Sequence, residues 1–222
     1  MLTLEFFGIL SAGFLLGLRH SLEPDHIAAV STIVSRGGPW RRAVLVGLTW
    51  GTGHTLTLFL VTLVTLGLKI AVPATLSRFL EIAVGVMLAV LGILILKRVF
   101  ADGLHKYNWD HSVGAGHSHG KAKHVPQHRA PFLIGLMHGL AGSASLLVLV
   151  VASMSSLTQS LLFSLIFGVG AMVGMALAGL VMSVPFLFAS EQRWLQPVLV
   201  LAPAFISIIL GLNIVHSNWA SY

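Results

Sequence analysis

Six apolar stretches, each long enough to cross a lipid bilayer as a helix, dominate this 222-residue chain. A span needs about 20 apolar residues, and a backbone in lipid must satisfy its own hydrogen bonds, so helices are expected. Only 9% of the residues are charged, whereas a soluble domain carries about 25%. The sequence predicts an all-α, polytopic membrane protein with six transmembrane helices: Leu4–Val34, Ala43–Leu68, Ala74–Leu96, Pro131–Ser153, Thr158–Phe188 and Leu195–Val215.

The first three spans resemble the last three. Gly17-Leu18-Arg19-His20 aligns with Gly135-Leu136-Met137-His138 at an offset of 118 residues, and Gly51-x-Gly53 aligns with Gly168-x-Gly170 at an offset of 117. A unit of three helices crosses the membrane an odd number of times, so two copies have opposite orientations. We therefore expect two inverted three-helix repeats, residues 1–100 and 131–222. The alternative is chance similarity between apolar segments.

A polar segment, residues 101–130, separates the two predicted repeats. Spaced histidines among glycines bind divalent metals weakly, and the alternative reading is a solvated linker. Ten Lys and Arg residues lie on the side of the membrane that holds this segment, against Lys69 and Arg78 on the other. The asymmetry places the segment in the cytoplasm and both termini outside. The segment contains six histidines: His105, His111, His117, His119, His124 and His128.

The first span contains several polar residues that are costly in lipid and are usually functional there. Pro24 cannot donate the hydrogen bond to the carbonyl of residue 20, so we expect a broken helix at this point. The break would bring Asp25 toward His20, Glu23 and His26 and would free the His20 carbonyl. Imidazole and carboxylate ligands suit nickel, cobalt, copper(II) or zinc. A polar packing cluster and a proton relay are the alternatives.

Two further histidines are candidate metal ligands. His54 follows Gly51 and Gly53, which allow another helix to approach closely, so His54 is expected to face the first span. His138 lies in the second-half counterpart of the first motif, which has no carboxylate. A histidine hydrogen-bonded to a backbone carbonyl is the alternative for each. The complete set of candidate metal ligands is His20, Glu23, Asp25, His26, His54 and His138, with no catalytic residue and no cofactor other than a transported ion.

The spacing His20-x4-Asp25-His26 resembles the signature of the nickel/cobalt transporter superfamily. Gly53-His54-Thr55 resembles that family's segment in the next helix. The six-span length and the run His-Gly-Leu-Ala-Gly-Ser from His138 are more similar to its compact, urease accessory UreH-like branch. The resemblance implies metal recognition by His20, Asp25 and His26, with His54 in support. The chain departs from many members at Glu23, where they have Asp, and at the following proline, where they have Ala.

These features predict a secondary transporter, not an enzyme, that moves nickel or cobalt across the cytoplasmic membrane. A membrane potential of 100 mV favours entry of a divalent ion by about 4.6 kcal/mol, which favours uptake. Alternatives are a proton-coupled divalent metal exporter, an intramembrane zinc-dependent hydrolase and a metal-sensing module that uses the polar segment. The expected partners are the ion, the lipid bilayer and a cytoplasmic metallochaperone. Nucleic acid is not expected, because the basic residues lie in loops without interleaved aromatic residues.

Overall fold

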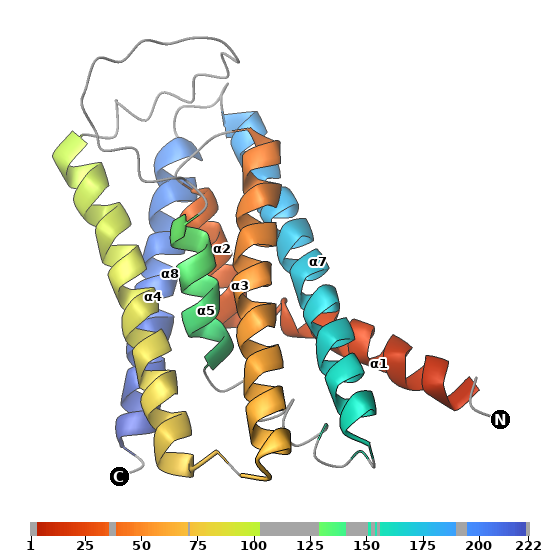
Figure 1. Ribbon diagram of the computed structural model, residues 1–222. Helices are drawn as coiled ribbons and strands as arrows, with labels where there is room; N and C mark the ends of the chain where they lie inside the picture. The colour runs from red at the N-terminus through yellow and green to blue at the C-terminus, as the bar shows by residue number, and fades with distance from the viewer. Residues whose placement is uncertain are drawn as a thin grey trace.

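Every regular element in the described part of the chain is a helix, as a computed structural model shows (Figure 1). The structure describes all residues except 1–3, 36–38, 71, 103–128, 141–150, 152–153, 155, 190–194 and 221–222. The helices are α1 (Leu4–His20), α2 (Pro24–Val34), α3 (Trp40–Gly67), α4 (Ala74–Asp102), α5 (Arg129–Leu140), α7 (Leu157–Ala189) and α8 (Leu195–Trp219).

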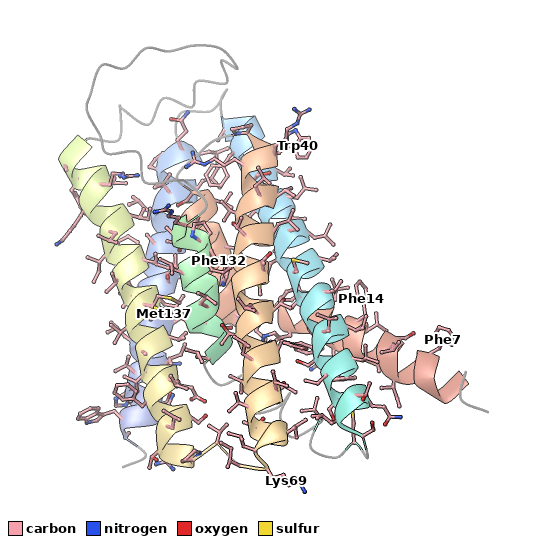
Figure 2. All side chains as sticks on the ribbon, in the orientation of Figure 1. Phe7, Phe14, Trp40, Lys69, Phe132 and Met137 are labelled. Carbon is pink, nitrogen blue, oxygen red and sulfur yellow. The ribbon has the colours of Figure 1, made fainter. Side chains whose placement is uncertain are left out.

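Four of these helices, α3, α4, α7 and α8, are long and apolar enough to cross a membrane. They correspond to the second, third, fifth and sixth spans that the sequence predicts. Helices α3 and α7 pack together, as do α4 and α8, and the two shorter helices α2 and α5 lie among them (Figure 1). Trp40 and Lys69 mark the opposite ends of α3 (Figure 2).

The first predicted span consists of two helices with a turn between them. Pro24 is the first residue of α2, and Glu23 before it is extended, with φ −62° and ψ 147°. A residue that precedes proline is sterically pushed toward this conformation, so the predicted break is confirmed. The predicted release of the His20 carbonyl is wrong, because that oxygen accepts a hydrogen bond of 3.0 Å from the Glu23 backbone N–H.

Of the fourth predicted span, the described residues comprise only its beginning, which lies in helix α5, and Val151 near its end. All six histidines of the polar segment fall outside the described residues. Helix α4 continues to Asp102 and α5 begins at Arg129, so helical structure extends into both ends of the predicted loop.

Helix α1 crosses α7 in its C-terminal half, and its N-terminal part projects from the bundle at a steep angle (Figure 1). Its N-terminal part therefore lies apart from the other helices, and Phe7 is 64% exposed (Figure 2). At the crossing the two backbones come so close that a Cβ atom at Gly17 would overlap the Phe167 carbonyl. A Cβ at Gly170 would likewise overlap the carbonyl of Phe14, which Figure 2 labels on α1.

Helix α5 crosses α3 in the same way. A Cβ at Gly135 would overlap the carbonyl of Trp50, and a Cβ at Gly53 would overlap the carbonyl of Phe132, labelled in Figure 2. Each of these two contacts is equivalent to one at the α1–α7 crossing, because the residues involved are related by the offset of 117 or 118 residues between the halves. The helix that opens each predicted repeat therefore packs on the second helix of the other repeat.

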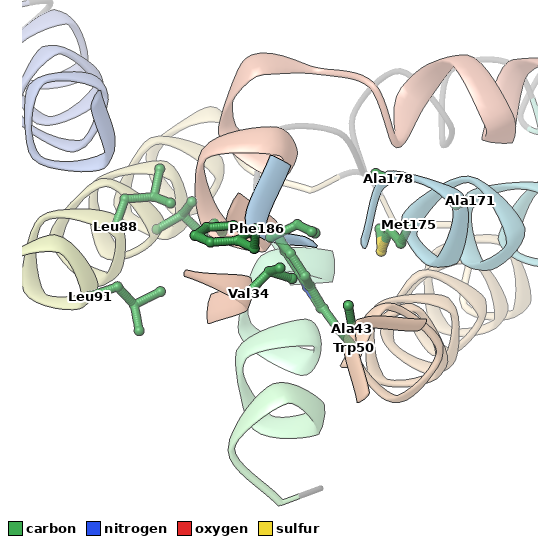
Figure 3. Close-up of a cluster of buried hydrophobic side chains, with 12 residues drawn as sticks. Val34, Ala43, Trp50, Leu88, Leu91, Ala171, Met175, Ala178 and Phe186 are labelled. Atoms are coloured by element: carbon green, nitrogen blue, oxygen red, sulfur yellow. The ribbon is translucent and has the colours of Figure 1, made fainter. Parts of the chain in front are cut away.

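A cluster of apolar side chains from α2, α3, α4 and α7 forms the main buried core. It includes Val34, Trp50, Leu88, Met175 and Phe186 (Figure 3). Trp50 is completely buried, and its ring stacks on that of His26 at a centroid distance of 5.8 Å and an interplanar angle of 9°. The core therefore packs against one side of a polar cluster that includes His26.

Candidate metal site

Four buried histidines and one aspartate meet where α1 ends and α2 begins. His20 is the last residue of α1, and Asp25 and His26 lie in the first turn of α2. His54 comes from the middle of α3, and His138 from the last turn of α5. The imidazoles are at most 6% exposed, whereas the Asp25 side chain is 27% exposed. Four different helices thus bring potential ligands to one place.

The first set of potential ligands is His20, His26 and His54, named here the imidazole group. Each residue offers one nitrogen, and the three nitrogens lie within 4.8 Å of one another. His20 Nε2 is 3.2 Å from His54 Nε2. Nitrogen ligands lie about 2.0 Å from a zinc-sized ion, which separates two tetrahedral ligands by about 3.3 Å. The pair is therefore spaced either to share a proton or to bind one ion.

The second set is Asp25, His26 and His138, named here the carboxylate group, whose ligand atoms also lie within 4.8 Å of one another. His138 Nε2 is 2.7 Å from Asp25 Oδ2, and His26 Nδ1 is 3.2 Å from Asp25 Oδ1. Each carboxylate oxygen of Asp25 thus contacts one histidine. His26 is the one residue that belongs to both groups.

Glu23 belongs to neither group. Its Oε1 lies 3.0 Å from His20 Nδ1, and its side chain is 45% exposed. A carboxylate on one imidazole nitrogen favours the tautomer in which that nitrogen carries the proton and the other is free to bind a metal. The contact therefore directs the lone pair of His20 Nε2 toward His54, so Glu23 is placed to orient a ligand.

Several buried polar atoms at the site have no hydrogen-bond partner. They are His26 Nε2, His54 Nδ1, His138 Nδ1 and Trp50 Nε1. A buried polar group without a partner costs about 1–3 kcal/mol. The free nitrogen of a neutral imidazole can bind a metal ion, whereas the indole N–H of Trp50 is a donor only. The sequence assigned no role to Trp50. Its position four residues before His54 was the available signal, since residues four apart share a helix face.

Together these features define a helical membrane protein with a histidine and carboxylate site at a broken helix. The urease accessory protein UreH of Bacillus sp. (strain TB-90) is 31% identical to this chain over 213 residues, which is 96% of this chain and 92% of that protein. The chain therefore belongs to the nickel/cobalt transporter superfamily, in its UreH-like branch, and is a membrane transport protein and not an enzyme. No protein-family model matches the chain, and no solved structure matches it.

Proposed function

We propose that this protein is a secondary transporter that carries nickel ions across the cytoplasmic membrane. The observation that carries the proposal is the convergence of four buried imidazoles and the Asp25 carboxylate at the break between α1 and α2. Nitrogen and oxygen ligands suit borderline divalent ions, and a broken helix is where transporters build binding sites. The urease accessory relative supports nickel as the cargo, and cobalt is a second cargo of the same ligand preference.

The ligands of the ion are His20, Asp25, His26, His54 and His138. The unpartnered Nε2 of His26, the 3.2 Å pair between His20 and His54 and the 2.7 Å contact of His138 with Asp25 support this assignment. Glu23, which the sequence places among the ligands, acts instead on the far nitrogen of His20.

The transporter consists of two inverted three-helix repeats, residues 1–100 and 131–222. The broken pair α1 and α2 forms the first span, and α5 begins the fourth. The exchanged crossings of α1 on α7 and α5 on α3 support this arrangement, because a two-fold relation between repeats produces each contact twice. Proteins of this construction bind their cargo near the midplane, where the repeats meet.

The end of the bundle that carries Arg41, Lys97 and Arg129 faces the cytoplasm. Most described basic residues lie near the ends of α3, α4 and α5 on this side, namely Arg41, Arg42, Lys97, Arg98 and Arg129, whereas Lys69 and Arg78 lie near the opposite ends of α3 and α4. Excess Lys and Arg mark the cytoplasmic side. In this orientation both termini lie outside. A membrane potential of 100 mV, negative inside, favours the entry of a divalent ion by about 4.6 kcal/mol. The direction is therefore uptake, with proton-coupled efflux as the competing direction.

Flux into proteoliposomes of known protein orientation tests the proposal. Nickel should enter through wild-type protein, faster with an inward-negative potential, and cobalt should compete with it. Vesicles that contain Asp25→Asn protein serve as the matched control, because this change removes a ligand charge and keeps the side-chain shape. No nickel flux through the wild type under any gradient would overturn the proposal, and flux that needs an opposing proton gradient would establish efflux.

A further inference from the structure

His26 lies at similar distances from two histidines that occupy equivalent positions in the two halves of the chain. Its ring centroid is 4.5 Å from that of His20 and 4.2 Å from that of His138. His20 and His138 are 118 residues apart, the offset at which the two halves align. The residue at the position equivalent to His26 is Ala144, so His26 is a central histidine that only the first half supplies.

The surroundings of His20 and His138 are also equivalent. The ring of His20 lies 5.4 Å from Phe167, and the ring of His138 lies 5.5 Å from Trp50. Phe167 and Trp50 are themselves related by the offset of 117 residues found for the second helix of each half. The two histidines therefore have matching aromatic neighbours, and each of them lies next to His26.

The imidazole group and the carboxylate group are built around these two matching histidines. His54 completes the first group and Asp25 completes the second. The equivalents of these two residues are Ala171 and Ser143, so each group takes its third ligand from the first half only. His26 is common to both groups. Its Nδ1 contacts Asp25, and its Nε2 has no partner.

We propose that the transported ion occupies the two groups in succession, with His26 as the ligand that it keeps during the transfer. This proposal rests on the proposed function and adds the path of the ion through the site. Each group faces one side of the membrane, because the repeat relation that exchanges His20 and His138 also exchanges the two sides. The hydrogen bond between His138 and Asp25 is the contact that an ion entering the carboxylate group replaces.

Only one ion is bound at a time. The two groups share His26, so two divalent ions would compete for it and would repel each other at this short separation in a poorly solvated site. The two bound states differ chemically. The imidazole group surrounds the ion with neutral nitrogens, whereas the carboxylate group supplies one negative charge and one fewer imidazole.

Nickel binding and nickel X-ray absorption on the purified full-length protein test this proposal with two single variants. His138→Ala should retain one nickel per chain bound by imidazoles without carboxylate. His54→Ala should retain one nickel bound by imidazole and carboxylate. The affinity of at least one variant should stay within about twofold of that of the wild type, because the group that binds nickel more tightly remains complete in it. Both should lose nickel flux at least tenfold, because transfer needs both groups.

His26→Ala should lose binding by more than either variant, since it removes the shared ligand. The variant His216→Ala removes an exposed histidine near the end of α8 and should behave as the wild type does. The variants His54→Gln and His138→Gln keep the side-chain volume and should reproduce the two ligand sets if an alanine variant fails to fold.

Four imidazoles around one nickel in the wild type would overturn the proposal, as would two nickel ions per chain. Identical ligand sets in the two single variants, or full flux in either, would also overturn it. In each of these cases nickel flux by the wild type would leave the proposed function standing. A wild type that neither binds nor transports nickel would overturn both.

Discussion

His138 Nε2 lies 2.7 Å from Asp25 Oδ2 although the two residues are 113 positions apart in the chain. The contact joins the end of α5 to the first turn of α2, and so joins the two halves of the protein at the candidate metal site. His138 is 1% exposed and Asp25 is 27% exposed. A largely buried carboxylate on an imidazole is a strong, short contact, and it controls whether either residue is free to bind an ion.

Replacing Asp25 with Asn should weaken nickel binding at least tenfold. The change keeps the shape of the side chain and removes the only negative charge in either ligand group. Equilibrium binding to purified protein measures the effect. Glu81→Gln is the matched control, since it neutralises a carboxylate on α4 outside both groups, and it should retain wild-type affinity. Unchanged affinity in Asp25→Asn would show that Asp25 is not a ligand in the state that binds nickel most tightly.

In the His138→Ala background, where only the imidazole group is complete, replacing Glu23 with Ala should weaken nickel binding about 10–100-fold without removing a ligand, because Glu23 orients His20 through Nδ1. Glu23→Gln should recover part of the loss, since its amide oxygen still accepts the hydrogen bond from the imidazole. X-ray absorption of bound nickel should count the same ligands in the His138→Ala protein and both variants. Loss of an oxygen ligand in either variant would show that Glu23 is itself a ligand of the nickel ion.

The substitution Gly135→Ala should lower the free energy of unfolding by about 1–3 kcal/mol, the usual cost of overpacking. The new Cβ would overlap the Trp50 carbonyl at the α5–α3 crossing. Gly17→Ala should have a similar effect at the equivalent crossing, whereas Gly8→Ala should have little effect, because a Cβ there meets nothing within 4 Å. Unfolding in detergent micelles measures all three. A cost at Gly8 equal to that at Gly135 would contradict the role of these crossings.

Acid should release the bound nickel. An imidazole binds a metal only in its neutral form, and its ordinary pKa of about 6.5 means that protons compete with the ion below neutral pH. The affinity should therefore fall at least about tenfold between roughly pH 7.5 and 5.5, a range in which an ordinary carboxyl stays ionised. Nickel titrations at a series of pH values measure this dependence. A constant affinity over this range would contradict this prediction.

The polar segment should be cytoplasmic and dispensable for basal transport, because its glycines and histidines offer no apolar face to bury. Replacing residues 103–128 with Gly and Ser, at the same length, removes all six of its histidines. Nickel flux at saturating metal should remain near the wild-type value. Reagents added outside intact cells should not label the native segment. Complete loss of flux in the replaced protein would instead show that transport depends on this segment.

The helical class, the lengths of the long helices and the break before Pro24 all follow from the sequence alone. These features depend on local properties: the length of an apolar run, the missing N–H of proline and the steric preference of the residue before it. The sequence also indicated the residues of the candidate site, because ionisable side chains are costly in lipid and therefore few in number. The offset between the halves indicated which residues are equivalent.

Only the tertiary structure decided how these residues meet. The turn after His20 keeps its carbonyl hydrogen-bonded, Glu23 lies on the far nitrogen of His20, and Asp25 reaches His138 on another helix. The stacking of Trp50 on His26 is likewise a contact between helices. Such contacts depend on where α1 crosses α7 and α5 crosses α3. Those crossings are set by close backbone packing at glycines far apart in the chain, which no local pattern specifies.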